Sequence, residues 1–343
     1  MKKSLLIVFA SALTLASCSN DETVKAPDTR MPISFQSHVS KTSRATDATT
    51  DNLNWFQVWG FNVDKSTNTV GQIFDGEMVT KNSSSAWTYT TPQYWVENKD
   101  YYFTAVSSSS TADASVLSLT YGSTVPAGEF YGAGTIVFNQ NQDKANAGNI
   151  DVVYAFQKAS TGATINTQPS AVDLSFKHAL SRIRVSFSND INSSAYSLRI
   201  SKVTISNAHA SGNLVLGEQN PTWSDLKSDI ALNLSDSPFT PSDVAANNST
   251  VSTGTKFIIP SAGMSLKLTF TVTLVQNDVD MASYTHTDVE MPATDFVMGH
   301  SYNFKASLTP KNLDPENEMY PITFTVNSVE DWQDFDDQDF NVN

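Results

Sequence analysis

The sequence predicts an all-β protein built from β-sandwich domains. Short segments with apolar residues at every second position recur along the chain, and clusters of Ser, Thr, Asn and Gly separate them. Only 16% of the residues are charged, and the abundance of β-branched and aromatic residues favours strands over surface helices. Because short strands at this spacing with turns between them are typical of sandwiches, we expect that architecture.

The first 17 residues have the pattern of a secretory signal peptide. Lys2 and Lys3 are followed by an apolar stretch from Leu5 to Leu15, which is too short to span a membrane. Cys18 is the single cysteine of the chain and stands where a lipobox places the lipidated residue. We therefore expect Cys18 to become a lipidated N-terminus; the alternative is an ordinary signal peptide with an incidental cysteine.

Length, charge and cysteine content limit the number of domains, the kinds of covalent or metal site, and the kinds of partner. A lone cysteine excludes a disulfide framework and a cysteine-based metal site. The 343 residues, less the leader, suit two domains of ordinary size. The formal net charge of −14 argues against nucleic acid as a partner and suits a soluble domain at a crowded surface.

The strands begin after a tether. Residues 19–30 lack any apolar period and are expected to be flexible. Alternation then predicts a half-buried strand whose apolar face consists of Ile33, Phe35 and Val39, and a polar stretch over 40–54 follows.

The strongest strand of the first half is expected over Trp55–Val63. It has an apolar residue at nearly every odd position and should be central in a sheet. Further strands of this half are predicted at Ile73–Val79, Trp87–Tyr94, Tyr101–Val106, Thr135–Phe138 and Val152–Phe156.

The pattern restarts after the turn-rich stretch Ser160–Ser170, which we take as a domain boundary. Residues 174–187 alternate like strands at both ends, and their middle can hold a bend or one helical turn. Further strands are predicted at 198–205, 212–216, 256–259, 266–275, 300–308 and 322–327. The chain is thus divided into a signal peptide (1–17), a leader with the first strand (18–44), an N-terminal domain (45–168), a C-terminal domain (169–320) and a final strand with an acidic tail (321–343).

No motif for catalysis, a cofactor or a metal is found, so we do not expect an enzyme. The five histidines show no i, i+2 or i, i+4 pair, and no nucleophile elbow, phosphate loop or dinucleotide fingerprint occurs. His178 lies on an apolar run and is interpreted as a hydrogen-bonded structural histidine. The acids over 330–339 lack the register of a calcium loop and suit a solvated tail. Carboxylate pairs for glycoside hydrolysis depend on the fold and stay open.

Four stretches carry a resemblance to a known family. They are the lipobox ending at Cys18, the Ile33-x-Phe35 strand followed by Ser43-Arg44-Ala45-Thr46, the segment Phe176–Ile183, and the closing Gly299–Phe304 with Ile322–Val326 and Trp332. In this order and spacing they resemble the fimbrillins, or type V pilins, of Bacteroidales, particularly the Mfa-like lipoproteins. The resemblance implies two transthyretin-like β-sandwich domains, lipoprotein export, and display on the outer membrane and in fimbriae.

The resemblance also implies a maturation step. A trypsin-like, arginine-specific protease cuts after an arginine, the first strand leaves, and a strand of another pilin subunit takes its place. A cut after Arg30 would release only the tether, whereas a cut between Arg44 and Ala45 would release tether, lipid and strand together. We expect the Arg44–Ala45 bond to be cleaved; the alternative is an uncleaved accessory protein with Arg44 in a surface loop.

The last strand offers a candidate for donation. Ile322, Phe324 and Val326 form one apolar face, which can leave its own subunit and enter another or complete the sheet of its own domain. The leading hypothesis is a structural or adhesive subunit, or an accessory protein, of type V fimbriae. One alternative is a solitary surface lipoprotein that binds glycan or a host ligand through exposed Trp and Tyr; an exported β-sandwich hydrolase is the third.

Overall fold

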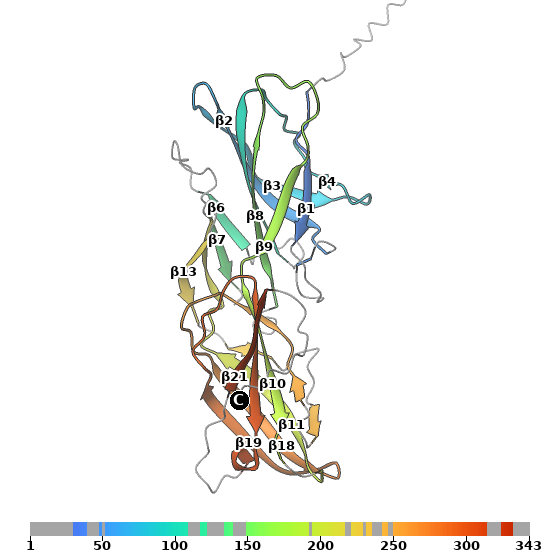
Figure 1. Ribbon diagram of the computed structural model, residues 1–343, viewed down its shortest axis with the longest axis vertical. Coiled ribbons are helices and arrows are strands. Elements are labelled where there is room, and N and C mark those ends of the chain that lie inside the picture. Colours follow the sequence, from blue (N-terminus) through green and yellow to red (C-terminus); the bar gives the residue numbers. More distant parts are fainter. Residues whose placement is uncertain are drawn as a thin grey trace, which may run out of the picture.

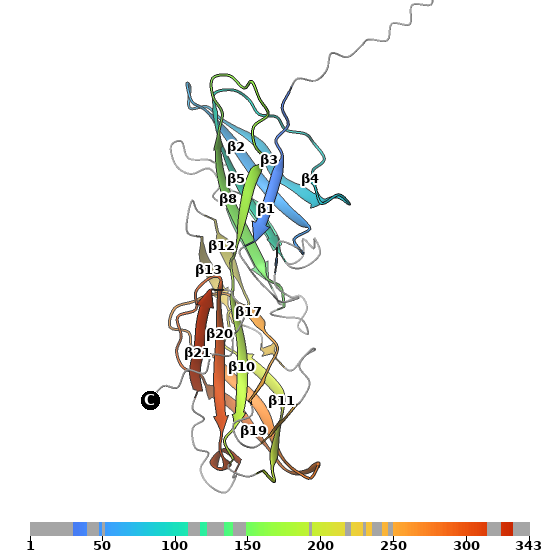
Figure 2. The same cartoon turned by 45° about the vertical axis from the view of Figure 1, so that its right-hand side comes forward.

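The computed structural model shows an all-β protein, which confirms the all-β prediction (Figure 1). The strands gather into two lobes that stack along the long axis (Figures 1 and 2). Within the described part of the chain, the only helical element is the 3-10 helix η2 (Pro310–Leu313). The structure describes residues 30–39, 48–49, 52–108, 117–121, 134–139, 149–191, 194–216, 221–228, 231–234, 242–245, 250–313 and 324–331.

A seven-stranded sheet forms the N-terminal lobe. Strand β1 (Phe35–Val39) pairs in parallel with β9 (Val172–His178) along five residues. In contrast, β9 and β8 (Val152–Ser160) are joined by only two register pairs. Strands β1 and β9 therefore turn away from the others and lie across them as a second layer (Figure 2). In spatial order the strands are β1 (Phe35–Val39), β9 (Val172–His178), β8 (Val152–Ser160), β5 (Lys99–Ser108), β2 (Trp55–Asp64), β3 (Val70–Lys81) and β4 (Trp87–Thr88).

Alternating aromatic side chains fill the space between these layers. Phe35 of β1 and Phe176 of β9 both contact Phe56 of β2, and each of the three is at most 6% exposed. Strand β2 lies between β5 and β3, in the central position predicted for it. Gly60 of β2 permits this packing, because a Cβ there would come within 2.8 Å of the Phe74 ring.

Two sheets form the C-terminal lobe. In the first sheet β10 and β20 pair in parallel along eight residues, and β21 is its edge strand. The first sheet comprises β16 (Thr250–Ser252), β10 (Ser181–Asn189), β20 (His300–Leu308) and β21 (Phe324–Asp331), with β17 (Lys256–Ile258) also on β10. The second comprises β14 (Leu232–Asn233), β11 (Ser197–Ser206), β18 (Lys267–Gln276) and β19 (Val279–Glu290), with β15 (Ser242–Ala245) also on β11.

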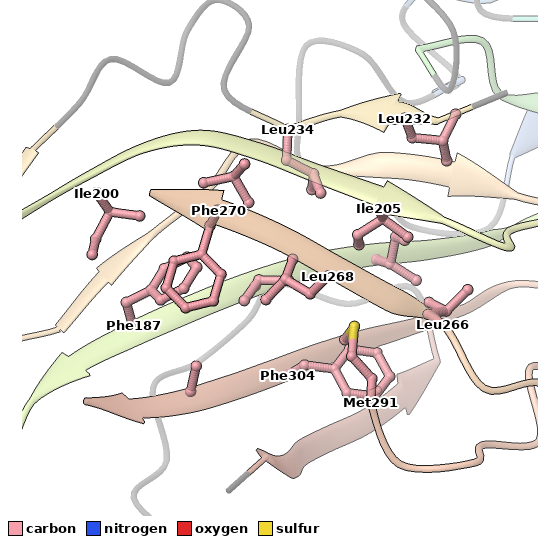
Figure 3. Packing of buried hydrophobic residues seen from close by; sticks show 14 of the residues in the cluster. Phe187, Ile200, Ile205, Leu232, Leu234, Leu266, Leu268, Phe270, Met291 and Phe304 are labelled. Atoms are coloured by element: carbon pink, nitrogen blue, oxygen red, sulfur yellow. The ribbon is translucent and has the colours of Figure 1, made fainter. Parts of the chain in front are cut away.

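The facing sides of these two sheets form the larger hydrophobic core. Figure 3 shows Phe187 of β10 against Phe270 of β18, whose ring centroids are 4.9 Å apart. Ile200 and Ile205 of β11 and Phe304 of β20 are fully buried in the same cluster. Two sheets packed face to face are the sandwich arrangement expected for this half.

A small four-stranded sheet between the lobes takes strands from both halves of the chain. Strand β7 (Gly134–Asn139) pairs antiparallel with β12 (Ser211–Val215) along five residues. Strands β6 (Leu117–Tyr121) and β13 (Thr222–Lys227) flank this pair. The lobes are thus joined by a shared sheet in addition to the connecting chain.

Strand pairing divides the chain differently from the boundary predicted at residue 169. Strand β9 follows that position, yet it pairs with β1 and β8 in the N-terminal lobe. The chain enters the C-terminal lobe only after β9, at the bend before β10. The stretch Ser160–Ser170 is a loop within the N-terminal lobe, and its polar composition alone does not distinguish it from a linker.

Of the bend and the helical turn that the sequence allowed within 174–187, the structure has the bend, because β9 ends at His178 and β10 begins at Ser181. The strand predicted over Trp87–Tyr94 is wrong for most of its length. Only Trp87–Thr88 forms β4, and Tyr94 makes a single bridge to Pro32. The aromatic residues of this segment pack onto the core from an irregular backbone, which produces apolar content without a strand.

The same tyrosine corner occurs in both lobes. The Tyr101 hydroxyl accepts from the Val96 N–H at 2.6 Å and donates to the carbonyl of that residue at 3.2 Å. The Tyr302 hydroxyl accepts from the Val297 N–H and donates to the Asp295 carbonyl, both at 2.9 Å. Burial raises the pKa of both tyrosines above the ordinary value of 10.0. In each lobe, therefore, a tyrosine hydroxyl fixes the preceding loop to the start of a core strand.

Several predicted positions lie outside the described residues: the signal peptide and Cys18, Arg44, Ala45, Ile322, Trp332 and the tail beyond Asp331. No helix among the described residues is both long and apolar enough to cross a membrane.

Candidate functional site

The candidate site is the position occupied by β1. Ile33, Phe35 and Val39 are 1%, 6% and 7% exposed and belong to the core of the N-terminal lobe. Gln36 and His38 point outward and are exposed. The apolar face predicted for this strand is therefore the face that the structure buries. We call the residues that contact β1 and its approach the β1 site.

Aromatic rings surround Phe35. The centroids of Phe56 and Phe74 lie 5.6 Å from that of Phe35, Tyr89 lies at 5.8 Å and Phe103 at 6.0 Å. These rings come from β2, β3, the chain after β4, and β5. Since edge-to-face and tilted ring pairs add to the energy of burial, Phe35 contributes strongly to holding β1 in place.

The chain just before β1 is hydrogen-bonded on two sides. The Ile33 N–H donates to the Gln93 carbonyl at 2.8 Å, and the Trp95 N–H donates to the Met31 carbonyl at 2.9 Å. On the other side the Val172 N–H donates to the Ser34 carbonyl at 2.7 Å. Residues 31–34 therefore lie between the segment 93–95 and β9. Removal of this chain would take backbone partners from the segment 93–95 and from β9.

Polar contacts line the outer side of the strand. The two ring nitrogens of His38 lie 3.2 Å from Asp173 Oδ1 and 2.8 Å from Ser175 Oγ, both on β9. The Arg30 guanidinium lies 4.1 Å from the centroid of the Tyr94 ring. These groups are exposed or half-buried, so they orient the strand more than they stabilise it.

The chain is held again beyond residues 40–47. The Ala48 N–H donates to Asp151 Oδ2 at 2.9 Å, and Ala48 is fully buried. Thr49 and Asn52 then close a tight turn in which each side chain accepts from the backbone N–H of the other. Leu53 follows, 1% exposed in the core. The predicted cleavage bond thus falls within a segment with fixed chain on either side.

The C-terminal strand that sequence analysis proposed for donation is β21. It pairs antiparallel with β20, with Phe324 opposite Ala306 and Val326 opposite Phe304. It has no partner on its other side within the described residues. An edge strand with one neighbour is the kind that can leave a sheet without breaking two ladders.

The described residues offer little other candidate chemistry. No group of three His, Cys, Asp or Glu able to hold a metal ion occurs in the described ranges. His178 is hydrogen-bonded through Nδ1 to Asp151 at 2.8 Å, as interpreted from its apolar setting. Trp55, Trp59 and Trp95 are 5–7% exposed, so their rings are core residues and not a sugar-stacking platform.

The sequence matches the model of one protein family, described as fimbrillin-like, over residues 43–332. The chain belongs to the fimbrillin-like family. A comparison with curated proteins finds no match.

Two solved structures support the fold of this fimbrillin-like chain. It is similar to a fimbrial protein from Bacteroides vulgatus ATCC 8482, with 16% identity, a TM-score of 0.57, and coverage of 88% of this chain and 99% of that one. It is also similar to a putative cell adhesion protein from Bacteroides eggerthii DSM 20697, with 12% identity, a TM-score of 0.52, and coverage of 88% and 96%. The family match thus places the chain among fimbrillin-like proteins, and the two solved structures show that the fold is shared.

Sequence reasoning missed two parts of the site of this fimbrillin-like protein. The backbone of residues 93–95 pairs with the approach to β1, although it lies far away in the sequence. Ala48 and Asp151 form the second anchor, and they are separated by more than a hundred positions. Neither contact has a sequence signal, because backbone pairing and single carboxylates do not produce periodic patterns.

Proposed function

We propose that this chain is a structural or adhesive subunit, or an accessory protein, of type V fimbriae, and that it assembles by strand exchange. The precursor is exported as a lipoprotein, held at the outer membrane through Cys18, and displayed at the cell surface. A protease then cuts after Arg44, β1 leaves with the lipid, and a strand from another subunit occupies the β1 site.

The observation that carries the proposal is how β1 is held. It is the first strand after the predicted tether and an edge strand, and together with Ile33 just before it, it supplies three buried apolar side chains to the N-terminal core. Its removal would expose the backbone of β9 and the aromatic rings around Phe35. An incoming strand with apolar residues at alternate positions would pair with the β9 backbone and cover these rings, as strand addition does in other complexes.

Backbone pairing beside Arg30 argues against that residue as the cleavage position. The bond after Arg30 adjoins Met31, whose carbonyl is hydrogen-bonded to Trp95. Proteases need a locally extended and accessible chain, so pairing on the scissile residues protects this bond. Cleavage there would in any case leave β1 in the sheet.

Donation by β21 is the other half of the proposal. Its edge position and the apolar alternation of Ile322, Phe324 and Val326 support it. The same features suit a strand that only completes its own sheet. Deletion of residues 321–343 separates the two roles, because a folded chain that no longer polymerises indicates donation, and loss of the folded C-terminal lobe indicates the local role.

Mass spectrometry of the N-terminal peptide of surface-purified protein tests the processing step. A chain beginning at Ala45 is expected; a chain beginning at lipidated Cys18 would indicate an uncleaved anchor or accessory protein. Arg44→Ala should retain the lipid and fail to form SDS-resistant ladders, whereas the matched control Arg30→Ala should be processed normally. Ladders formed by the Arg44→Ala protein would contradict the proposal.

A solitary lipoprotein that binds glycan or a host ligand is the second hypothesis from the sequence. It relied on exposed Trp and Tyr, and Trp55, Trp59 and Trp95 are buried instead. Retention of the monomer on glycan columns would be needed to restore it.

A further inference from the structure

Strand β9 lies beside β1 in the β1 site, and most of its backbone pairing is with β1. Along residues 172–176 its register partners lie on β1. Its pairing with β8 is limited to Lys177 and His178, supplemented by the Ala179 N–H donating to the Val152 carbonyl at 2.8 Å. A strand held by hydrogen bonds at only one end opens easily. Buried Leu174 and Phe176 pack β9 onto the core, and a polar contact at its held end would fix its register while β1 is absent.

A buried pair lies at the held end of β9. His178 is the last residue of the strand, and Asp151 directly precedes β8. The Nδ1–H of His178 donates to Asp151 Oδ2 at 2.8 Å, with side chains that are 2% and 0% exposed. A hydrogen bond between two buried side chains is costly to break, because the remaining partner is left unsatisfied away from water. The pair therefore connects the end of β9 firmly to the start of β8.

The same carboxylate oxygen has a second donor, the backbone N–H of Ala48 at 2.9 Å. One side chain thus joins the start of β8, the end of β9 and the chain that leads into β2. All three points lie after the proposed cleavage bond at Arg44–Ala45, and none of these contacts involves a residue that leaves with β1. The connection is therefore complete both before and after processing.

We infer that Asp151 and His178 are positioning residues that hold β9 and the new start of the chain in place after β1 leaves, so that the β1 site stays ready for an incoming strand. This inference rests on the proposed strand exchange. The pair does not contact the incoming strand; it acts through β9, whose backbone supplies the hydrogen bonds that a new strand needs.

The test uses the full mature chain with a site for a sequence-specific protease in place of residues 40–47, so that nicking does not depend on Arg44. After nicking, a labelled peptide of residues 30–39 is added in excess, and fluorescence anisotropy reports its exchange with β1. Asp151→Asn should weaken peptide binding about tenfold, the value expected for a weakened buried hydrogen bond. Asp100→Asn is the matched control, because this carboxylate lies on β5 at the other end of β8 and is 42% exposed.

Hydrogen exchange of β9 amides distinguishes positioning from general stability. We expect Asp151→Asn to raise exchange of β9 strongly in the nicked chain without β1 and only slightly in the intact chain. An equal rise in both states would mean a merely structural role and would overturn the inference. So would equal peptide binding by the variant and the wild type.

Substitutions of His178 keep the inference testable if the Asp151→Asn protein fails to fold. His178→Asn places an amide N–H near the position of Nδ1 and should retain most peptide binding, whereas His178→Ala should lose it. Unchanged binding by His178→Ala would overturn the inference while leaving strand exchange intact. A nicked wild-type chain that never exchanges β1 for the peptide would overturn the proposed function and this inference together.

Discussion

Replacing Phe35 by alanine tests whether β1 is a removable part of the core. Phe35 is 6% exposed and contacts four aromatic rings. Truncating a phenylalanine in such a setting removes its transfer free energy and leaves a cavity, which together cost about 3–5 kcal/mol. We expect the precursor to lose that much free energy of unfolding, which corresponds to roughly 10 °C in the melting temperature of the N-terminal lobe.

Urea denaturation followed by tryptophan fluorescence measures this loss, since Trp87 and Trp95 belong to the same cluster. Gln36→Ala is the control, because it changes an exposed side chain of the same strand and should cost less than about 0.5 kcal/mol. Chains that have lost residues up to Arg44 no longer contain position 35, so processed protein from wild type and variant should be identical in stability. A loss below about 1 kcal/mol in the Phe35→Ala precursor would refute the reasoning, because it would mean that β1 does not unfold with the lobe.

Three further changes probe other parts of the structure. Gly60→Ala brings a methyl group to 2.8 Å from the Phe74 ring and should destabilise the N-terminal lobe by about 1–3 kcal/mol in the same denaturation assay. Because burial raises the pKa of Tyr101 and Tyr302, the folded protein keeps hydroxyl protons that the unfolded chain releases. The free energy of unfolding should therefore be steady with respect to these groups below about pH 10 and fall above it, and Tyr101→Phe should make the fall less steep in an alkaline titration of stability. Deletion of residues 321–343 should leave the circular dichroism of the β-sheets largely intact and abolish SDS-resistant ladders, and ladders formed by the deleted chain would exclude β21 as donor.

The parts of the fold that sequence patterns predicted are strands with at least one clearly apolar face. Strand β2 is apolar on both faces, with Phe56 in one cluster and Trp59 in another, and β1 with its approach buries Ile33, Phe35 and Val39 as expected. Strand β19 was missed because it is an edge strand whose outward residues are largely Ser, Thr and Asp, so its sequence resembles a loop. Alternation is visible only where the inward face is apolar, and in β19 the one fully buried residue is a histidine, His286.

The candidate site was predictable to a similar extent. Ile33, Phe35 and Val39 were identified because alternation marks which side chains point inward. The partners of β1 were not, because its pairing with β9 joins segments more than a hundred residues apart, and no local signal specifies such a register. The place of β9 in the first lobe likewise has no local signal, since it follows from pairing with β1 and β8 and from core packing of residues such as Phe176.

The small sheet between the lobes has a mechanical consequence. Because β7 and β12 come from different halves and pair along five residues, pulling the lobes apart lengthwise loads those hydrogen bonds together rather than one after another. Trp223 adds a bond across the same region, from its ring N–H to the Ala179 carbonyl at 2.9 Å. A chain joined only by a flexible linker would stretch under tension. This one should transmit force from end to end as a stiff rod, and a fibre made from such units would bend at the contacts between subunits before it yields within them.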